Sequence, residues 1–529
     1  MRNHGWGLAV AVLLSLGDVD AQSPPATRHP PRAPYDLLIR GGQVVDGTGA
    51  AARAADVGIV GDRIVFVGRA NANDPAPKRT IDAAGLVVAP GFVDPHAHVL
   101  EDLSSPERRS NLAYLMQGVT TVITGNDGGG PPDVAGTLAL WDAQKIGTNA
   151  ALLVGHGSVR RRVLGMADTP PTAAQLDSMR ALVAGAMEGG ALGLSTGLYY
   201  APGSYASTEE VIELAKVAAR AGGIYDSHLR DESSYSIGLL AAVDEAIRIG
   251  REAAIPVNIS HVKALGVDVW GFSDSVVARI RAARAAGTRV TADQYPYLAS
   301  GSSVGASLLP RWAEAGGGDS LRARLIDPTS RVRIVAEMER NLVRRGGAAS
   351  LLMTSSRDQR LIGKTLERVA AERGVSPVQA AVDIVLAGGA SVASFNMTER
   401  DVETFMRQDF VMTGSDGSAG HPRKYGTYPR KLREYVFKRR VLTLPDAIRR
   451  GSALTAETFG IADRGKLVEG AYADVIVFDP ATVADRATYE EPTRLAVGMR
   501  YVIVNGVVAV DGGEYTAALA GRAVRRGGR

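Results

Sequence analysis

An apolar run that begins at Gly85 ends in the stretch Val88-Ala89-Pro90-Gly91-Phe92-Val93-Asp94-Pro95-His96-Ala97-His98. An apolar run of this length predicts a buried strand. Residues two apart in a strand point to the same side, so His96 and His98 project together from the strand end. The chain has eight histidines, and two of them stand here. Because imidazole is the commonest metal ligand, the stretch predicts a metal site at the end of a buried strand.

Seven further strand-like runs follow, separated by helical segments. They cover residues 118–124, 150–154, 191–195, 222–227, 255–260, 289–293 and 410–413. Helix starts are readable as the capping-box sequences Ser207-Thr-Glu-Glu210 and Thr172-Ala-Ala-Gln175, and as Ser376-Pro377. Eight apolar strands that alternate with helices predict an α/β protein with a closed (β/α)8 TIM-like barrel. An open doubly wound sheet is the alternative, but no Gly-x-Gly-x-x-Gly follows any of these strands.

Short strands and turns occupy both ends of the chain. In residues 35–89, apolar and polar positions alternate around a Gly61-Asp62 turn. Residues 465–515 show the same alternating pattern of short strands and turns. We therefore expect strands from both termini to form one small β-sandwich domain, with the barrel over residues 90–464. A Gly-rich segment and a charged helix predict an insertion late in the barrel, at about residues 298–350, which we interpret as a lid over the site.

The charge balance points away from nucleic acid. The 529-residue chain has a formal net charge of +4, and its basic clusters, such as the tail over residues 516–529, are typical of solvated surfaces. A composition of 45% hydrophobic and 22% charged residues is ordinary for a globular enzyme. The chain has no cysteine, so disulfides and thiolate metal ligands are excluded.

The first 21 residues have the features of a signal peptide. A weakly basic start precedes an apolar run from Trp6 to Leu16, which is too short to span a bilayer. Small residues before the end of this segment predict cleavage after Ala21, and a Pro/Ser/Arg linker follows over residues 22–34. Without a cysteine for a lipid anchor, we expect a periplasmic or secreted protein with no membrane anchor after signal removal.

Five of the eight predicted strands end in residues that bind metals or move protons. These residues are His96 and His98, Asn126 and Asp127, His228, His261, and Asp416. The active site of a (β/α)8 barrel lies at the C-terminal strand ends, so these side chains are expected in one mouth. Such ligands can hold zinc with an open position for water, and zinc lowers the pKa of that water to about 7. Asp416 is the candidate for carrying a proton from the water to the leaving amine.

The order of the motifs resembles the amidohydrolase superfamily and, more narrowly, the D-aminoacylases (N-acyl-D-amino-acid deacylases). The superfamily-level motifs are Asp94-Pro-His-Ala-His98, His228-Leu-Arg-Asp-Glu232, Ile259-Ser-His-Val-Lys263 and Gly414-Ser-Asp-Gly417. The motifs of the narrower branch are Ser195-Thr-Gly-Leu-Tyr-Tyr-Ala-Pro-Gly203, Asp293-Gln-Tyr-Pro-Tyr297 and His421-Pro-Arg-Lys-Tyr-Gly-Thr-Tyr-Pro-Arg430. The likeness runs from about residue 35 to residue 512.

This resemblance implies a zinc-dependent deacylase acting on a small molecule that carries a carboxylate. It assigns a tightly bound zinc ion to His228 and His261, a second metal to His96 and His98, and the role of catalytic acid/base to Asp416. The substrate-binding residues that it implies are Tyr199, Lys263, Tyr295, Tyr297 and Arg423. A lysine or arginine suits the fixed negative charge of an N-acyl amino acid.

The chain departs from the family pattern after its second predicted strand. Family members carry a cysteine ligand in a Gly-Asn-Cys-Gly sequence, whereas this chain has Gly125-Asn126-Asp127-Gly128. Asp127 offers a harder oxygen ligand that is able to bridge two metals. The fourth predicted strand has no lysine that could serve as a bridge. We therefore expect one or two zinc ions, with Asp127 as a ligand.

The predicted function is zinc-dependent hydrolysis of a linear amide, from an N-acyl-D-amino acid to a carboxylate and a D-amino acid, by metal-bound hydroxide. A metallopeptidase or D-dipeptidase, or a cyclic amidase, is the enzymatic alternative, because fold does not determine substrate. An inactive periplasmic binding protein is the alternative from another class. Retention of Asp416 and of every other ligand argues against it.

Overall fold

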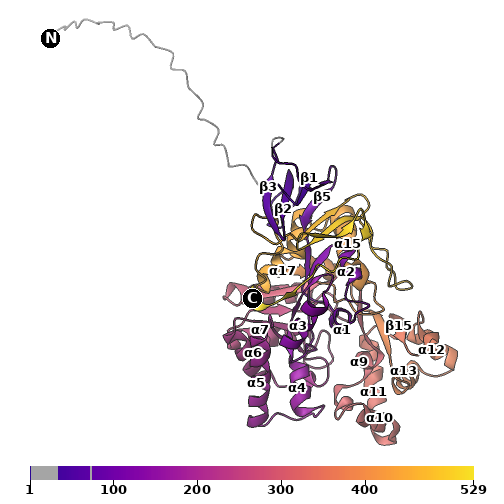
Figure 1. Cartoon of the computed structure of the whole chain (residues 1–529). Coiled ribbons are helices and arrows are strands. Elements are labelled where there is room, and N and C mark those ends of the chain that lie inside the picture. Colours follow the sequence, from indigo (N-terminus) through magenta and orange to yellow (C-terminus); the bar gives the residue numbers. More distant parts are fainter. Residues whose placement is uncertain (2–33, 72–73, 529) are drawn as a thin grey trace.

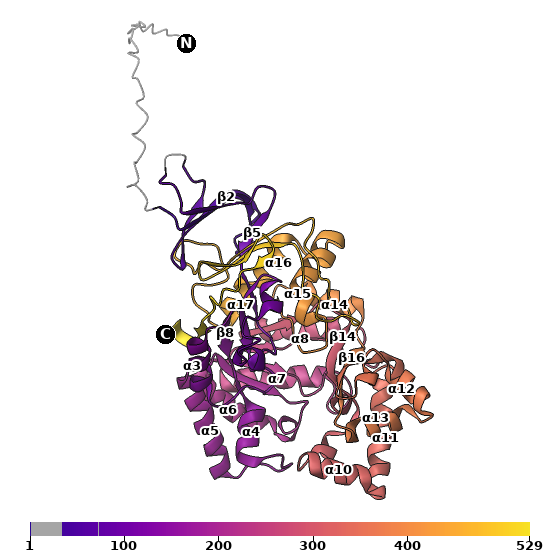
Figure 2. The ribbon, with the colours of Figure 1, turned by 45° about the vertical axis from the view of Figure 1, so that its right-hand side comes forward.

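The computed structural model describes residues 1, 34–71 and 74–528, which form a barrel, a β domain and an α/β insertion (Figure 1). The β domain lies at one end of the barrel, and the insertion (orange in Figure 2) lies at its side. Apart from Met1 and Pro34, the predicted signal peptide and linker lie outside the described residues. Within the described part of the chain, every helix is too short or too polar to cross a membrane.

Eight parallel strands form the barrel, which confirms the predicted (β/α)8 fold. They are β6 (Phe92–Asp94), β7 (Val119–Thr124), β8 (Asn149–Leu152) with its continuation β9 (Val154–Gly155), β10 (Gly193–Gly197), β11 (Ile224–His228), β12 (Val257–Ile259), β13 (Val290–Gln294) and β17 (Val411–Thr413). Successive strands pair in chain order. A bridge between Ala97 and Gly417 closes the circle, and the Asp416 N–H donates to the His96 carbonyl at 2.8 Å. Closure therefore brings the ends of the first and last strands together.

Helices cover the outside of the barrel. The longer ones are α3 (Val134–Gln144), α4 (His156–Leu164), α5 (Ala173–Glu188), α6 (Thr208–Arg220), α7 (Leu239–Ala253), α8 (Ser273–Ala285), α14 (Glu399–Met406), α15 (Arg423–Arg430), the π-helix η5 (Lys431–Lys438) and α16 (Leu444–Gly451). The shorter ones are α1 (Leu100–Ser104), α2 (Leu112–Leu115), η1 (Gly203–Tyr205) and α17 (Ala453–Thr458).

The predicted helix starts are present, with one difference. Thr172 and Gln175 form the reciprocal capping box at α5. At α6 the Ser207 side chain accepts from the Glu210 N–H, but the Glu210 carboxylate turns inward and binds His156 Nε2 at 2.8 Å. The expected capping box is therefore only half formed, because this glutamate serves a buried hydrogen bond instead.

The β domain is one sheet of nine strands drawn from both ends of the chain. Its N-terminal strands are β1 (Leu37–Val44), β2 (Arg53–Val60), β3 (Arg63–Gly68), β4 (Arg79–Asp82) and β5 (Val87–Pro90), and its C-terminal strands are β18 (Val475–Phe478), β19 (Met499–Val504), β20 (Val507–Asp511) and β21 (Glu514–Tyr515). The two groups meet where β5 pairs antiparallel with β18. Ile39, Val57, Val475 and Ile503 share one buried core, so strands from both termini form one domain as predicted, but they hydrogen-bond into a single sheet and not into the two sheets of the predicted sandwich.

The apolar run before His96 forms two strands rather than the single expected one. β5 belongs to the β domain and β6 to the barrel, and Gly91 joins them. A Cβ atom at Gly91 would lie 2.1 Å from Thr120 Oγ1, so only glycine allows the backbone to pass this close to β7. The same eleven-residue stretch therefore connects the two parts of the molecule and delivers the two histidines.

The insertion is longer than predicted. A three-stranded antiparallel sheet, in the order β14-β16-β15, frames it. Its elements are β14 (Ala299–Ser303), α9 (Val304–Leu308), η2 (Arg311–Glu314), α10 (Gly318–Ile326), α11 (Pro328–Arg344), η3 (Ala348–Ser350), β15 (Leu351–Ser356), η4 (Gln359–Leu361), α12 (Leu366–Arg373), α13 (Pro377–Leu386) and β16 (Ala390–Phe395). It thus ends near residue 395, not near 350, because its first strand needs its last as a partner. Leu308, Ile334 and Val382 lie in its own hydrophobic core.

The predicted basic tail is packed against the barrel. β22 (Ala523–Val524) pairs in parallel with β8, and the short η6 (Arg526–Gly528) follows it. The Arg526 N–H donates to the Gly190 carbonyl at 3.1 Å, just before β10. Arg522 and Arg525, expected to be solvated, form ion pairs with Asp62 and Asp142 at 2.7 Å each. The backbone of this segment thus bonds to β8 and to the residues just before β10. This pairing joins segments far apart in the sequence, and local composition does not reveal it.

Candidate metal centre

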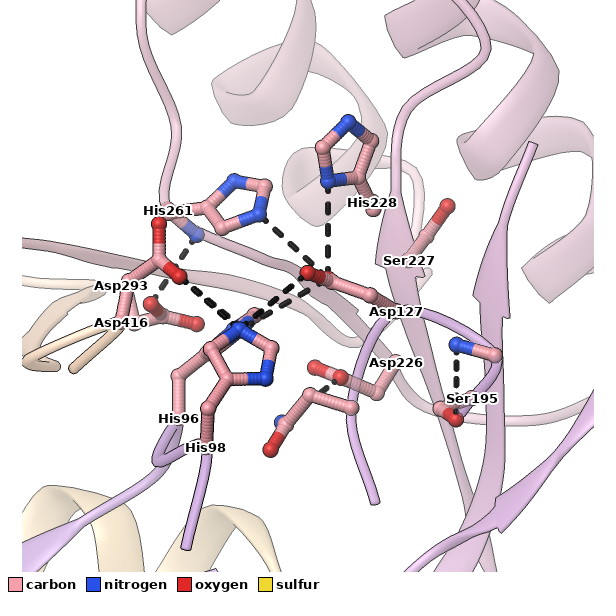
Figure 3. A network of polar contacts seen from close by, with 12 residues as sticks. His96, His98, Asp127, Ser195, Asp226, Ser227, His228, His261, Asp293 and Asp416 are labelled. Carbon is pink, nitrogen blue, oxygen red and sulfur yellow. Dashed lines mark hydrogen bonds and ion pairs between the residues drawn. The ribbon is translucent and has the colours of Figure 1, made fainter. Parts of the chain in front are cut away.

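Six side chains from the carboxyl ends of five barrel strands converge on one point (Figure 3). His96 and His98 follow β6, Asp127 follows β7, His228 ends β11, His261 follows β12, and Asp416 follows β17. The histidines and aspartates named from the sequence as metal-ligand candidates are thus all brought together. Asn126, which was named with Asp127 at the end of the second strand, does not join them, because its amide donates to the Asp226 carboxylate at 3.1 Å.

Asp127 lies in the middle of the four imidazoles. Its Oδ1 is 3.5 Å from His96 Nε2, 3.5 Å from His228 Nδ1 and 3.4 Å from His261 Nε2, and its Oδ2 is 3.4 Å from His98 Nε2. These separations exceed ordinary hydrogen bonds. They match the spacing of about 3.3–3.5 Å between two ligands of one tetrahedral zinc ion whose bonds are about 2.0–2.2 Å long. The arrangement therefore fits ligands that share a metal, with Asp127 common to all four histidines.

Unsatisfied polar atoms support the same conclusion. Both ring nitrogens of His96, both of His228 and the Asp127 Oδ1 are buried without a hydrogen-bond partner among the described residues. One nitrogen of each ring, His96 Nε2 and His228 Nδ1, faces the orphaned Asp127 Oδ1. Because buried polar atoms are nearly always satisfied, these three atoms together indicate a missing partner, and a divalent cation that accepts nitrogen and oxygen ligands would satisfy them.

Three of the ligand candidates have left-handed backbone conformations. The φ angles are 56° at Asp127, 37° at His261 and 47° at Asp416. Aspartate and histidine adopt this region more often than most residues, but it remains unfavourable. Such backbone strain concentrates at functional sites, where surrounding bonds hold it. Here the strained turns direct the three side chains into the barrel mouth.

Buried acids below the centre hold these turns in place. The Asp94 Oδ1 accepts from the N–H groups of His96 and Ser415, at 3.0 Å each, and so ties the end of β6 to that of β17. The Asp293 Oδ1 accepts from the His261 N–H at 2.9 Å. Burial raises the pKa of Asp94 to about 7. These contacts orient the ligands from behind, as supporting groups do in metal sites.

Asp416 is held as an anion beside the centre. Its Oδ1 lies 3.0 Å from His98 Nε2, and its Oδ2 lies 2.8 Å from Arg423 Nη1. Burial would raise the pKa of Asp416, but the Arg423 guanidinium and the neighbouring imidazoles hold it well below its usual range. Burial likewise opposes the ionisation of Asp127, yet His96, His228 and His261 keep its pKa low. Both carboxylates can therefore act as ligands or accept a proton at neutral pH.

A cavity of about 410 Å³ opens over the centre. Four of the five predicted substrate-binding residues line it, namely Tyr199, Lys263, Tyr295 and Arg423. Tyr297 does not. Its hydroxyl donates to the Pro422 carbonyl at 3.4 Å, and its ring packs edge-on against His421. Tyr297 lies two residues after Tyr295 in an irregular segment, and its side chain faces away from the cavity. Tyr297 therefore supports the cavity wall and does not contact a ligand.

Two charged residues of the site were not predicted. Glu232 Oε1 lies 2.5 Å from Lys263 Nζ and 3.1 Å from His261 Nδ1. Its position four residues after His228 in the quoted motif was a usable signal. Arg345 also lines the cavity, but it comes from the insertion, where no motif marks it. Strands β14 and β16 supply the rest of that wall, so the insertion lies beside the centre and completes the cavity.

A closed barrel with clustered imidazoles and carboxylates at the carboxyl ends of its strands defines a metal-dependent hydrolase. Sequence comparison is in agreement, and the chain belongs to the amidohydrolase family, whose profile matches residues 79–510.

The comparisons also confirm the resemblance to the D-aminoacylases. The D-aminoacylase of Alcaligenes xylosoxydans xylosoxydans is 36% identical over 520 residues, which cover 93% of this chain and 98% of that enzyme. The N-acyl-D-glutamate deacylase of Bordetella bronchiseptica, solved with zinc and a phosphonate mimic of the tetrahedral intermediate, matches with a TM-score of 0.79 at 34% identity. A structure of D-aminoacylase, from work on the functional role of that enzyme's binuclear metal centre, matches with a TM-score of 0.80 at 35% identity. Each of the two structural matches covers 93% of this chain and 100% of the other.

Proposed function

We propose that this protein is a zinc-dependent deacylase that hydrolyses the amide of an N-acyl-D-amino acid to a carboxylate and a free D-amino acid. The observation that carries the proposal is the centre around Asp127, with the ionised Asp416 beside it and a cavity lined by cations above it. Similarity to a D-aminoacylase and to a zinc-containing N-acyl-D-glutamate deacylase supports the substrate class and the metal.

Two overlapping sets of residues would hold the metal. Asp127, His228 and His261 form one set, and His96 and His98 form the other around the same Asp127 carboxylate. A zinc ion held there would supply a Lewis acid for the amide carbonyl and would activate water at neutral pH. Because Asp127 faces both sets, its carboxylate would contribute to each of them.

Asp416 moves the proton. Arg423 engages its Oδ2, which leaves Oδ1 directed toward His98 and the centre. Asp416 takes a proton from the attacking water and then gives it to the amide nitrogen, so that the amine leaves neutral as the C–N bond breaks. A carboxylate that is ionised in the resting state is suited to begin this sequence.

The ring of Tyr295 lies close to two cations of the cavity lining. Lys263 Nζ is 5.9 Å and Arg423 Cζ is 4.5 Å from the centroid of its ring. Its hydroxyl is buried without a hydrogen-bond partner among the described residues. This donor, with two cations close to its ring, suits the α-carboxylate of the substrate.

The test is an amide-hydrolysis assay with zinc quantified in the same sample. We expect acetate release from N-acetyl-D-amino acids at least about 100-fold faster than from their L enantiomers, loss of activity after chelation, and recovery with zinc. Dipeptides of both hands and cyclic amides serve as comparison substrates. Cleavage of dipeptides or cyclic amides alone would contradict the substrate class, and zinc-free protein without turnover would favour a binding protein.

Export is the second part of the proposal. The basic start, the apolar run from Trp6 to Leu16 and the small residues before Gln22 support signal-peptide cleavage. Full-length protein expressed in a Gram-negative host is expected in the periplasmic fraction with Gln22 as its N-terminus. Intact-mass measurement tests this directly, and a cytoplasmic product that retains residues 1–21 would contradict it.

A further inference from the structure

Arg345 is a buried cation that faces the substrate cavity. It directly follows α11 of the insertion, and its side chain is 2% exposed. Its Nε donates to the Tyr235 hydroxyl at 2.5 Å, and its Nη2 donates to the Tyr199 hydroxyl at 3.3 Å. Nη1 lies 3.5 Å from Ser300 Oγ. Each nitrogen thus has one partner, and all three partners are neutral.

The other two cations of the cavity differ in this respect. Lys263 is paired with Glu232 at 2.5 Å, and Arg423 is paired with Asp416 at 2.8 Å. No carboxylate lies within ion-pair distance of Arg345 in the described part of the chain. A guanidinium has five N–H donors, so at least one of those on Arg345 remains available even when the Asn396 amide oxygen accepts from Nη1. Burying such a group without an anion is unfavourable, which marks the position as one that an anion completes.

Among the residues that the structure describes around Arg345, no carboxylate is free to act as its counterion. The Asp231 carboxylate, which acts electrostatically on Tyr235, is engaged by the backbone N–H groups of Ser233, Ser236 and Gly238. The Asn396 amide can turn its oxygen to within 3.2 Å of Nη1, and it is neutral. The adjacent Arg344 adds positive charge, with its guanidinium 5.8 Å from the centroid of the Tyr235 ring.

Arg345 lies one aromatic ring away from the metal centre. The Tyr199 ring, whose hydroxyl contacts Arg345, stacks on the His228 ring at a centroid separation of 5.9 Å. The proposed α-carboxylate position around Tyr295 lies next to other residues of the centre. Its two cations, Lys263 and Arg423, contact His261 and Asp416 respectively. The cavity therefore has two cationic positions, one next to His228 through Tyr199 and one next to His261 and Asp416, and only the one at Arg345 lacks an anion of its own.

We propose that Arg345 binds a carboxylate in the substrate's side chain, so that the preferred substrates are N-acyl-D-amino acids with an acidic side chain. This inference rests on the proposed deacylase function and names the substrates of that site. Discrimination arises because a neutral side chain leaves the buried guanidinium without its anion.

The decisive comparison uses N-acetyl-D-glutamate and N-acetyl-D-glutamine, which have the same size and differ in charge. In the wild-type enzyme we expect kcat/KM to favour the glutamate substrate by about 100-fold. Arg345→Met should reduce this ratio to nearly 1, and Arg345→Lys should give an intermediate ratio. Arg344→Met is the matched control, because Arg344 touches the same Tyr235 ring but lines a neighbouring pocket, and it should keep the wild-type ratio.

The outcomes separate this inference from the function on which it rests. Hydrolysis of both substrates by the wild type at similar kcat/KM overturns the role of Arg345 and leaves the deacylase intact. Retention of the glutamate preference in folded Arg345→Met also overturns it. Absence of hydrolysis of any N-acyl-D-amino acid contradicts the proposed function itself. If Arg345→Met does not fold, the wild-type ratio and Arg345→Lys still decide the question.

Discussion

Asp416→Asn lowers kcat by about 10³-fold or more while zinc content stays close to the wild-type value. General acid–base groups contribute about 10²–10⁴-fold, and an amide cannot accept the proton of the attacking water. The Asn oxygen can still face Arg423 or His98, so the surrounding contacts are largely kept. Asp127, His228 and His261 do not depend on Asp416 for their mutual geometry. Steady-state release of D-amino acid, with metal analysis of the same preparation, measures both quantities.

Asp485→Asn is the matched control for this variant. Asp485 is 7% exposed and Asp416 is 6% exposed, and Asp485 also pairs with arginines, at 2.9 Å from Arg433 and 3.3 Å from Arg430. It does not line the cavity. Its replacement should reduce stability and leave kcat within a few-fold of the wild type. Equal losses of kcat in both variants, or a loss below tenfold in Asp416→Asn, would show that Asp416 is not the proton carrier.

Asp127→Ala loses zinc and activity together. Its carboxylate is the group that faces all four imidazoles, so removing it takes one ligand from both sets at once. We expect bound zinc below about one tenth of the wild-type amount and a fall in kcat/KM of about 10³-fold or more, because the Lewis acid is lost. Metal analysis after exhaustive dialysis, followed by the assay with and without added zinc, provides the measurement. Full zinc content in Asp127→Ala would refute its role as a ligand.

Asp127→Cys separates a lost ligand from a damaged backbone. A thiolate is a strong zinc ligand, and the family pattern that the sequence resembles has cysteine at this position. This variant should retain zinc and part of the activity, although position 127 has a φ of 56° that neither alanine nor cysteine favours. If Cys and Ala lose zinc equally, the conformation of the turn, and not the ligand atom, holds the metal.

Periodicity and motif spacing were sufficient to predict the barrel and most of its centre. Five of the eight barrel strands end in, or are closely followed by, a histidine or aspartate of the centre, so the local pattern marks both the strand and the candidate ligand, as in β11 with His228. Because the strands of a closed barrel are parallel, their carboxyl ends lie together at one face, independent of the length and sequence of the loops that connect them. Asp127 was identifiable because it replaces a family ligand at a fixed distance from β7.

The features that were not predicted depend on partners that are distant in sequence. The insertion ends at β16 because β16 pairs with β14. Their paired residues, from Ser303 with Ser391 to Ala299 with Phe395, are far apart in the sequence, and neither strand has a distinctive composition. The C-terminal Arg-rich segment resembles a solvated tail until β8 provides its partner. Tyr295 and Tyr297 are equivalent in the motif, and only the packing of His421 against one of them assigns the other to the cavity.

The sequence by itself determined the fold class, the β domain built from both termini and the candidate metal ligands, because hydrophobic period and residue chemistry are local properties. Only the tertiary structure decided that Asp127 stands between four imidazoles, that Arg423 and Lys263 are already paired, and that Arg345 is not. Charge pairing inside a cavity depends on which side chains from distant segments come within about 4 Å, and that distance is set by packing. The proposed preference for an acidic side chain follows from that packing.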